Sequence, residues 1–191
     1  KGIKDGGAPI GSWSSGGALN TARDNMSSIG VSNTAALAAG GSPGSKDNVE
    51  VYNGSAWTET TEINTARSYA QGQFGTSTSG IISGGPGSST ATESWNGSAW
   101  TEITEINTGR SGAAGAGADN TSGVIFGGDS PTKALTEQWN GSSWTEKGDL
   151  NTGRTLYGSG GGTTSTAALA AAGDAGPAAS AKAESWNGSA W

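Results

Sequence analysis

Arginine and glutamate recur together at fixed places in this 191-residue sequence. Every arginine ends the tetrapeptide Asn-Thr-(Ala/Gly)-Arg, and one glutamate follows each of them at a similar distance. The arginines are Arg23, Arg67, Arg110 and Arg154, and the glutamates are Glu50, Glu93, Glu137 and Glu184. A ring of arginines could bind an anionic sugar or the carboxylates of a partner. One arginine and one glutamate per repeat fit better with an ion pair inside each unit that fixes the register of its strands, so we expect a structural role.

Aromatic residues form the second recurring set, and they occur in pairs around an Asn-Gly-Ser triplet. The pairs are Tyr52 with Trp57, Trp95 with Trp100, Trp139 with Trp144, and Trp186 with Trp191. Each ring could stack on a sugar or pack between neighbouring units, where burial of a large apolar side chain contributes roughly 1.5–3 kcal/mol. Packing is the stronger interpretation for all of them. The first ring of each pair is the candidate ligand-binding residue, and the second ring is a structural residue.

Several kinds of chemistry are missing from the sequence. It contains no histidine and no cysteine, which removes the Ser-His-Asp triad, thiolate metal sites and disulfides. No calcium-loop or phosphate-loop motif is present, the net charge is −6 without a basic stripe, and no apolar run approaches the ~20 residues of a membrane span. We therefore expect no catalytic residue, metal, cofactor, nucleic acid or membrane partner. A glycosidase that uses only carboxylates is the remaining enzymatic alternative.

Tryptophan marks an internal repeat of about 44 residues. The marker positions are Trp13, Trp57, Trp100, Trp144 and Trp191. They divide the chain into an N-terminal segment, 1–13, and four units, 14–57, 58–100, 101–144 and 145–191. Each unit carries the same features in the same order, so we predict one repeat domain.

Each unit is predicted to form four short strands. An apolar run ends in Gly-Gly, and Asn-Gly between two aromatic residues predicts a hairpin with a type I′ turn. No segment has a helical period. The fourth unit is longer near 160–164, where we expect a loop. Four short strands at this period are typical of a propeller blade, and the predicted fold is an all-β, small β-propeller of four four-stranded blades.

The positions of the two chain ends within the repeat predict how the ring closes. The last unit ends at Trp191, where its fourth strand should begin, and Trp13–Leu19 corresponds to Trp57–Ile63 of the next unit. We therefore expect the N-terminal segment to complete the last blade, which would also remove exposed strand edges. Two alternatives stay open: the chain is part of a larger ring or array, or two chains form an eight-bladed ring.

These features resemble the kelch repeat, in which an arginine precedes the first strand, Gly-Gly ends the second, and an aromatic residue and a tryptophan follow. Here they are Arg67, Gly84-Gly85, Trp95 and Trp100, with equivalents in every unit except that Asp174 replaces one glycine. The resemblance covers essentially the whole chain. The sequence Trp-Asn-Gly-Ser-Ser-Trp-Thr-Glu, followed by Leu-Asn-Thr-Gly-Arg, also resembles kelch-like arrays of marine bacteriophage structural proteins. That resemblance implies a virion surface or fibre component.

The expected function is that of a non-enzymatic structural or binding module, acting in assembly or adhesion at a virion surface or in an extracellular setting. Its partners would be other virion or surface proteins, with glycans and a second copy of the chain as further partners. A lectin-like propeller with one shallow site per blade is the alternative. The binding surface should lie in the loops that differ between units, which are Ser42–Asn48, Pro86–Thr90, Asp129–Ala134 and Asp174–Lys182.

Overall fold

The computed structural model describes residues 15–129, 131–157, 160–176 and 178–191, which contain strands and turns. The first sheet contains β1 (Ser27–Ser32), β2 (Ala35–Ala39), β3 (Val49–Tyr52) and β4 (Trp57–Thr60), and the second contains β5 (Gly72–Thr76), β6 (Ser79–Ser83), β7 (Thr92–Trp95) and β8 (Trp100–Glu102). The third contains β9 (Ala114–Asp119), β10 (Ser122–Phe126), β11 (Thr136–Trp139) and β12 (Trp144–Glu146), and the fourth contains β13 (Gly160–Thr164), β14 (Ala167–Ala171) and β15 (Ala183–Trp186). In these residues we find no helix of the length and apolar character that crossing a bilayer requires.

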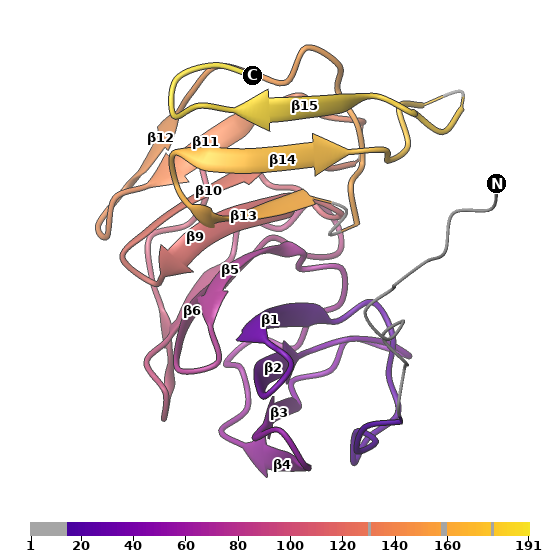
Figure 1. The fold of residues 1–191 in the computed structure, drawn as a ribbon, viewed down its shortest axis with the longest axis vertical. Helices are drawn as coiled ribbons and strands as arrows, with labels where there is room; N and C mark the ends of the chain where they lie inside the picture. The colour runs from indigo at the N-terminus through magenta and orange to yellow at the C-terminus, as the bar shows by residue number, and fades with distance from the viewer. Residues whose placement is uncertain (1–14, 130, 158–159, 177) are drawn as a thin grey trace, which may run out of the picture.

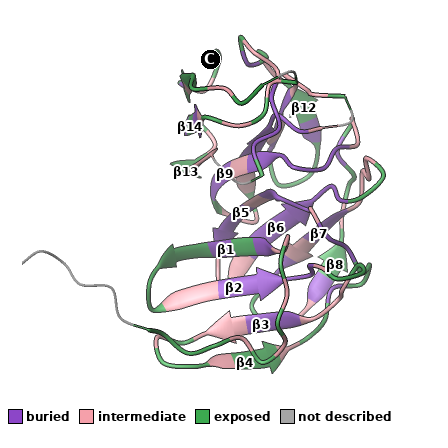
Figure 2. Cartoon of the chain, turned by 90° about the vertical axis from the view of Figure 1, so that its right-hand side faces the viewer, coloured by how far each residue is buried: buried purple, intermediate pink, exposed green. Residues whose placement is uncertain are grey.

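The four sheets are the blades of a four-blade β-propeller, as predicted. Every sheet is antiparallel, and its strands lie in chain order (Figure 1). We number the blades 1 to 4 along the chain. Figure 2 shows the strands of blade 1 in this order, from β1 beside blade 2 to β4 at the far edge. In the first three sheets the fourth strand begins at the tryptophan that ends the unit and continues into the next unit, so that Trp57 pairs with Tyr52 and Trp100 pairs with Trp95.

The Asn-Gly hairpins form, but their turn is not the predicted type I′. Four residues separate the paired Tyr52 and Trp57, and only Gly54 of the Asn-Gly dipeptide has a positive φ. The side-chain Oδ1 of Asn53 instead accepts hydrogen bonds of 3.0 Å from the backbone N–H groups of Ser55 and Ala56. Asparagine therefore closes the turn through its side chain, as in an Asx turn, and the same bonds recur at Asn96, Asn140 and Asn187.

Apolar side chains are buried mainly between blades. We call the face of a blade toward the preceding blade its front face and the opposite face its rear face. Between blades 1 and 2, Leu37 on the rear face meets Trp95 and Trp100 on the front face. The same contact recurs between blades 2 and 3 and between blades 3 and 4. Because each sheet has only four short strands, it can bury its two faces only against its neighbours.

The inner strands of neighbouring blades pack closely because their side chains are small. Strand β5 packs on β1 and β9, and β13 packs on β9. Phe74 of β5 occupies the space over Gly117 and Gly123, where a Cβ on either glycine would overlap its ring. The segment Gly160–Thr164, predicted as a loop, forms the inner strand β13, because its glycines fit this crowded position beside β9.

The structure differs from the predicted closure of the ring. The fourth sheet has three strands, and β13 does not pack on β1 as the other inner strands pack on one another. Trp13 and Ser14 lie outside the described residues, and Ser15–Leu19 forms no strand. A Cβ on Gly17 would lie 2.8 Å from the carbonyl oxygen of Ser55 in blade 1.

The path of the N-terminal segment explains this difference. Thr61, in the linker from blade 1 to blade 2, donates a 2.8 Å hydrogen bond to the carbonyl oxygen of Ser98 in the hairpin turn of blade 2. Gly17 passes the equivalent turn of blade 1 and so follows the path of an inter-blade linker. Trp191 already packs on Trp186 and Phe126, at the position predicted for Trp13.

Candidate functional site

Each arginine lies inside its blade and binds the recurring glutamate. In blade 3, Arg110 donates to the carboxylate of Glu137, to the carbonyl oxygen of Leu135 at 2.9 Å and to that of Thr108 at 3.1 Å. Glu137 also accepts backbone N–H hydrogen bonds from Asn107 at 2.7 Å and Thr108 at 3.2 Å. One buried pair therefore joins the incoming linker to strand β11 and to the residue before it.

The same ion pair occurs in all four blades. The pairs are Arg23–Glu50, Arg67–Glu93, Arg110–Glu137 and Arg154–Glu184, and the side chains of all eight residues are buried or nearly so. Each glutamate also accepts the backbone N–H of the asparagine that opens the Asn-Thr-(Ala/Gly)-Arg motif, at 2.7 Å. An anionic ligand could reach these guanidinium groups only if a blade came apart, so the arginines form no ligand site in this structure.

The pKa values of Glu50 and Glu184 reflect the partners of these two carboxylates. Burial by itself would raise the pKa of Glu50, but hydrogen bonds from the N–H groups of Asn20 and Thr21, together with the charge of Arg23, hold it below its ordinary value of 4.5. The pKa of Glu184 is lowered in the same way, since the bonds from Asn151 and Arg154 outweigh the effect of burial. The carboxylates of Glu50 and Glu184 are therefore stabilised in their charged form in the folded state.

The rings of all four aromatic pairs are tilted, with centroids 5.1–5.5 Å apart. The three pairs of blades 2, 3 and 4 lie between blades. Trp95, Trp139 and Trp186 are at most 3% exposed, and each indole N–H donates to a backbone carbonyl oxygen. A sugar could stack on these three rings only if two blades separated. Tyr52, the fourth candidate, lies on the front face of blade 1 and is half-buried.

A chain of backbone hydrogen bonds crosses the blades just after the arginines. The N–H of Tyr69 donates to the carbonyl oxygen of Asn25 at 2.8 Å, that of Gly112 donates to Tyr69 at 3.2 Å, and that of Tyr157 donates to Gly112 at 2.9 Å. All four residues have left-handed backbone conformations, with φ between 43° and 61°. We call these residues the rim.

The two tyrosines of the rim were not predicted from the sequence as site residues. A bulky side chain rarely adopts positive φ, and such residues cluster at functional sites. Tyr69 and Tyr157 meet edge to face with ring centroids 6.3 Å apart, and Tyr157 is 52% exposed. Burial and the nearby Asp129 raise the pKa of the Tyr157 hydroxyl, which stays protonated at neutral pH. The only signal in the sequence is a tyrosine two or three residues after two of the four arginines.

The four variable loops begin beside the rim. Asp24 pairs with Ser42 at the start of the first loop, Ser111 accepts the N–H of Asp129 at 2.9 Å, and Thr155 pairs with Asp174. Each loop connects the second and third strands of its blade, and all blades run in the same direction around the rim. The loops and the rim therefore form one surface, which we call the loop face.

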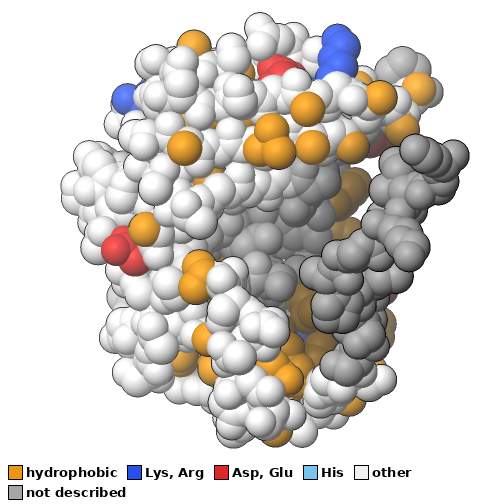
Figure 3. All heavy atoms as spheres, in the orientation of Figure 1, with side chains coloured by type: hydrophobic (Ala, Val, Ile, Leu, Met, Phe, Trp, Pro, Cys, Tyr) orange, Lys and Arg blue, Asp and Glu red, His pale blue; other side chains and the backbone are white. Residues whose placement is uncertain are grey.

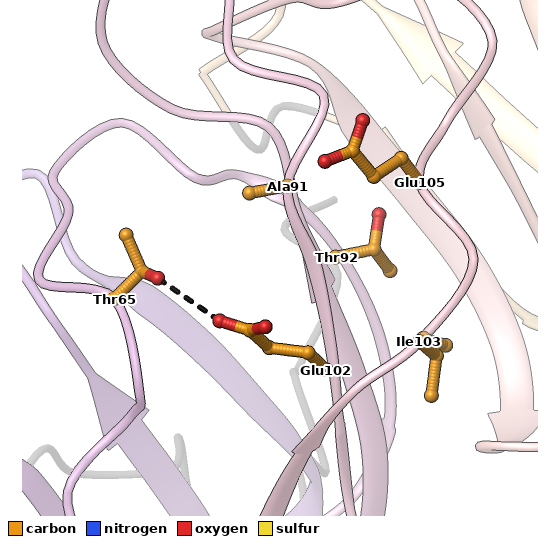
Figure 4. Close-up of a pocket in the computed structure, with 6 residues that line it drawn as sticks. All are labelled: Thr65, Ala91, Thr92, Glu102, Ile103 and Glu105. Atoms are coloured by element: carbon orange, nitrogen blue, oxygen red, sulfur yellow. Dashed lines mark hydrogen bonds between the residues drawn. The ribbon is translucent and has the colours of Figure 1, made fainter.

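A shallow pocket of about 190 Å³ lies on blade 2, next to the end of its variable loop, where Thr90 donates a 2.6 Å hydrogen bond to Glu105. Figure 4 shows the carboxylate of Glu102 pointing toward Thr65, with Glu105 beyond Ala91 and Thr92. Related carboxylates recur in other units, as Glu59 with Glu62 and as Glu146 with Asp149. The carboxylates of this pocket therefore belong to the repeat. The described residues contain no cluster of three potential metal ligands.

Neither a known protein-family model nor a curated protein matches this chain.

Proposed function

We propose that this chain is a non-enzymatic structural or binding module whose loop face contacts a partner during assembly or adhesion. The observation that carries the proposal is the position of the four variable loops, which gather on one face of the propeller beside the rim. Binding surfaces commonly consist of loops held by a rigid scaffold. The repeated arginines, glutamates and tryptophans form that scaffold.

The loops differ in chemistry from blade to blade, which favours a large partner over several copies of one small ligand. The second loop is uncharged, and the other three each carry one lysine and one aspartate at different spacing, which are Lys46 with Asp47, Lys133 with Asp129, and Lys182 with Asp174. Four different loops on one face suit a single protein surface of matching shape and charge. One shallow sugar site per blade would instead need the same exposed residues in each blade.

The setting that we propose is the surface or a fibre of a virion, with other structural proteins as partners. This proposed setting rests on the resemblance of the repeated sequence to kelch-like arrays of marine phage structural proteins. Particles from the source of this sequence should contain the chain in a fixed ratio to the other structural proteins, measured by quantitative mass spectrometry. Detection of the chain only in the particle-free fraction would count against this setting.

A pair of double variants tests the role of the loop face. Ser45→Glu with Thr132→Glu adds two charges to this face, and Asn33→Glu with Ser142→Glu adds the same charges to turns at the opposite ends of the blades. All four residues are exposed or half-buried, so both proteins should fold as judged by circular dichroism. Only the first variant should fail to enter particles. Equal incorporation of both variants would contradict the role of the loop face.

Carbohydrate binding at the rim is the second candidate function, favoured by the exposed Tyr157 beside Tyr69. An exposed aromatic ring next to carboxylates can stack on a sugar while the carboxylates accept its hydroxyl groups. A glycan array should then give hits that Tyr157→Ala removes and Tyr52→Ala retains. An array without hits for the wild-type chain would reject this candidate.

A further inference from the structure

The rear face of blade 4 exposes a position that is buried in every other blade. Leu169 on β14 is 51% exposed, whereas its equivalents Leu37, Ile81 and Val124 are each 0% exposed. The neighbouring Ala183 and Ser185 on β15 are exposed as well. Figure 3 shows hydrophobic side chains in a row over blade 4, near the top of the view.

The front face of blade 1 is uncovered in the same way. Its aromatic pair, Tyr52 and Trp57, is half-buried, whereas the equivalent Trp95 and Trp100 of blade 2 are 0% and 6% exposed. In Figure 1 blade 1 extends downward from its inner strand and blade 4 extends upward. Among the described residues these two end blades do not cover each other, since β1 and β13 lack the close packing that joins the other neighbouring inner strands.

The two uncovered faces are the two halves of a contact that the chain makes three times. An aliphatic side chain on each rear face shares one core with the aromatic pair of the next front face: Leu37 with Trp95 and Trp100, then Ile81 with Trp139 and Trp144, then Val124 with Trp186 and Trp191. Leu169 presents the aliphatic half of this contact, and Tyr52 with Trp57 presents the aromatic half. The two halves lie at opposite ends of the chain of blades.

We propose that two copies of this chain join head to tail, with the rear face of blade 4 packed on the front face of blade 1 in the second copy. The reciprocal contact, between the front face of blade 1 in the first copy and the rear face of blade 4 in the second, closes a ring of eight blades around a two-fold axis. A second copy is the partner that fits these end faces, because it offers the same surfaces that already pack on each other between neighbouring blades inside one chain. A head-to-tail interface gives a closed ring when its rotation closes.

The direct test is the mass of the full chain in solution, measured by analytical ultracentrifugation over the micromolar range. The wild-type chain should be a dimer. Leu169→Asp should be monomeric, with dimerisation weakened at least about a hundredfold, because a carboxylate buried in an apolar contact has no partner. Leu169 is exposed within one copy, so this variant should keep the wild-type circular dichroism spectrum.

Tyr157→Asp is the matched control. Tyr157 has nearly the same exposure as Leu169, 52% against 51%, but lies on the rim and not on an end face. The substitution adds the same charge, and aspartate tolerates a left-handed backbone better than most residues. This variant should remain a dimer. Dissociation of both variants to the same extent would show that added charge alone separates the copies, and would overturn the assignment of the contact.

Mixing two variants tests the head-to-tail arrangement. Tyr52→Asp disables the front face of blade 1 and Leu169→Asp disables the rear face of blade 4, so each should be monomeric alone. A mixture retains one intact contact, between Leu169 of the first variant and Tyr52 of the second, and should form a heterodimer. If Tyr52→Asp dimerises alone, two rear faces bind each other and the head-to-tail contact is wrong.

A wild-type chain that stays monomeric throughout the micromolar range would overturn the proposal.

Discussion

Arg110 and Glu137 illustrate how this protein uses its few charged residues. Both side chains are buried, and the carboxylate joins the guanidinium to the backbone of the incoming linker. The one-to-one recurrence of arginine and glutamate predicted a structural pair, and the structure places each pair within one blade. The sequence could not show that the glutamate also fixes the linker, because that contact depends on backbone N–H groups that carry no sequence signal.

Removal of one member of this pair should be costly. Arg110→Met leaves the buried Glu137 carboxylate without its cation, and a broken buried pair typically costs about 3–5 kcal/mol of folding free energy. Combining it with Glu137→Gln should restore part of the loss, because the remaining charge is then removed as well. Urea unfolding measures both changes.

Lys147→Met is the control for that experiment, since it removes a positive charge from a half-exposed position. Surface changes of this kind are usually within about 0.5 kcal/mol. A loss for Arg110→Met no larger than the loss for Lys147→Met would show that the pair does not stabilise the blade.

Acid should destabilise the protein through the same carboxylates. The pKa values of Glu50 and Glu184 are lower in the folded chain than their ordinary value of 4.5. The unfolded state therefore binds protons first as the pH falls, and the stabilisation present above about pH 4.5 is lost as the pH drops through the folded values. The thermal midpoint should be flat near neutral pH and fall below about pH 4.5.

Glu184→Gln should lower stability at neutral pH and reduce the steepness of this acid loss, because one of the responsible groups is gone. A scan of thermal midpoints from pH 7 to pH 3 compares the two proteins. A wild-type midpoint that rises on acidification would contradict the assignment of lowered pKa values.

At the scale of single elements, Gly-Gly marks the end of each second strand and allows a close approach. Gly84 has a φ of +82°, and a Cβ at this position would overlap the carbonyl oxygen of Arg110 in the next unit. The sequence predicted the strand end correctly. It could not predict the turn type after Asn-Gly, because the Asn53 side chain competes with the backbone for the same N–H groups.

Two glycine substitutions separate backbone strain from close approach. Gly87 also has a positive φ, +70°, but nothing lies within 4 Å of a Cβ placed there. Gly87→Ala should cost only the strain of a left-handed alanine, about 1–2 kcal/mol. Gly84→Ala adds a steric overlap with the backbone, which typically costs a further 1–3 kcal/mol.

Urea midpoints of the two variants give the comparison, with circular dichroism to confirm that both retain their strands. Equal losses for Gly84→Ala and Gly87→Ala would show that the chain at Arg110 moves freely, and that the Gly-Gly pair is not needed for packing between neighbouring units.

At the scale of the whole molecule, stability depends on contacts between blades. Each of the three inter-blade cores combines aliphatic residues of one blade with an aromatic pair of the next. A sheet of four short strands is too small to be stable alone, so loss of one such contact should affect the neighbouring blades together.

Trp95→Ala and Tyr52→Ala test this dependence at equivalent positions of two blades. Trp95 is buried between blades 1 and 2, and its truncation should cost about 3–5 kcal/mol. Tyr52 is half-buried on an uncovered face. Its truncation should lower the free energy of unfolding clearly less, when measured on dilute protein in which the end faces of two copies stay apart. Similar losses at both positions would mean that the front face of blade 1 is covered within a single copy.

The sequence by itself determined the repeat, the all-β class, the four blades and the pairing of arginine with glutamate. These follow from local features that recur in phase, and strand period, turn residues and residue counts can be read along one chain. Only the tertiary structure decided that the fourth sheet has three strands among the described residues, that Trp95, Trp139 and Trp186 are covered, and that Tyr69 and Tyr157 meet on the rim. Those outcomes depend on the curvature accumulated from blade to blade, and on contacts between residues far apart in the chain, which no single repeat specifies.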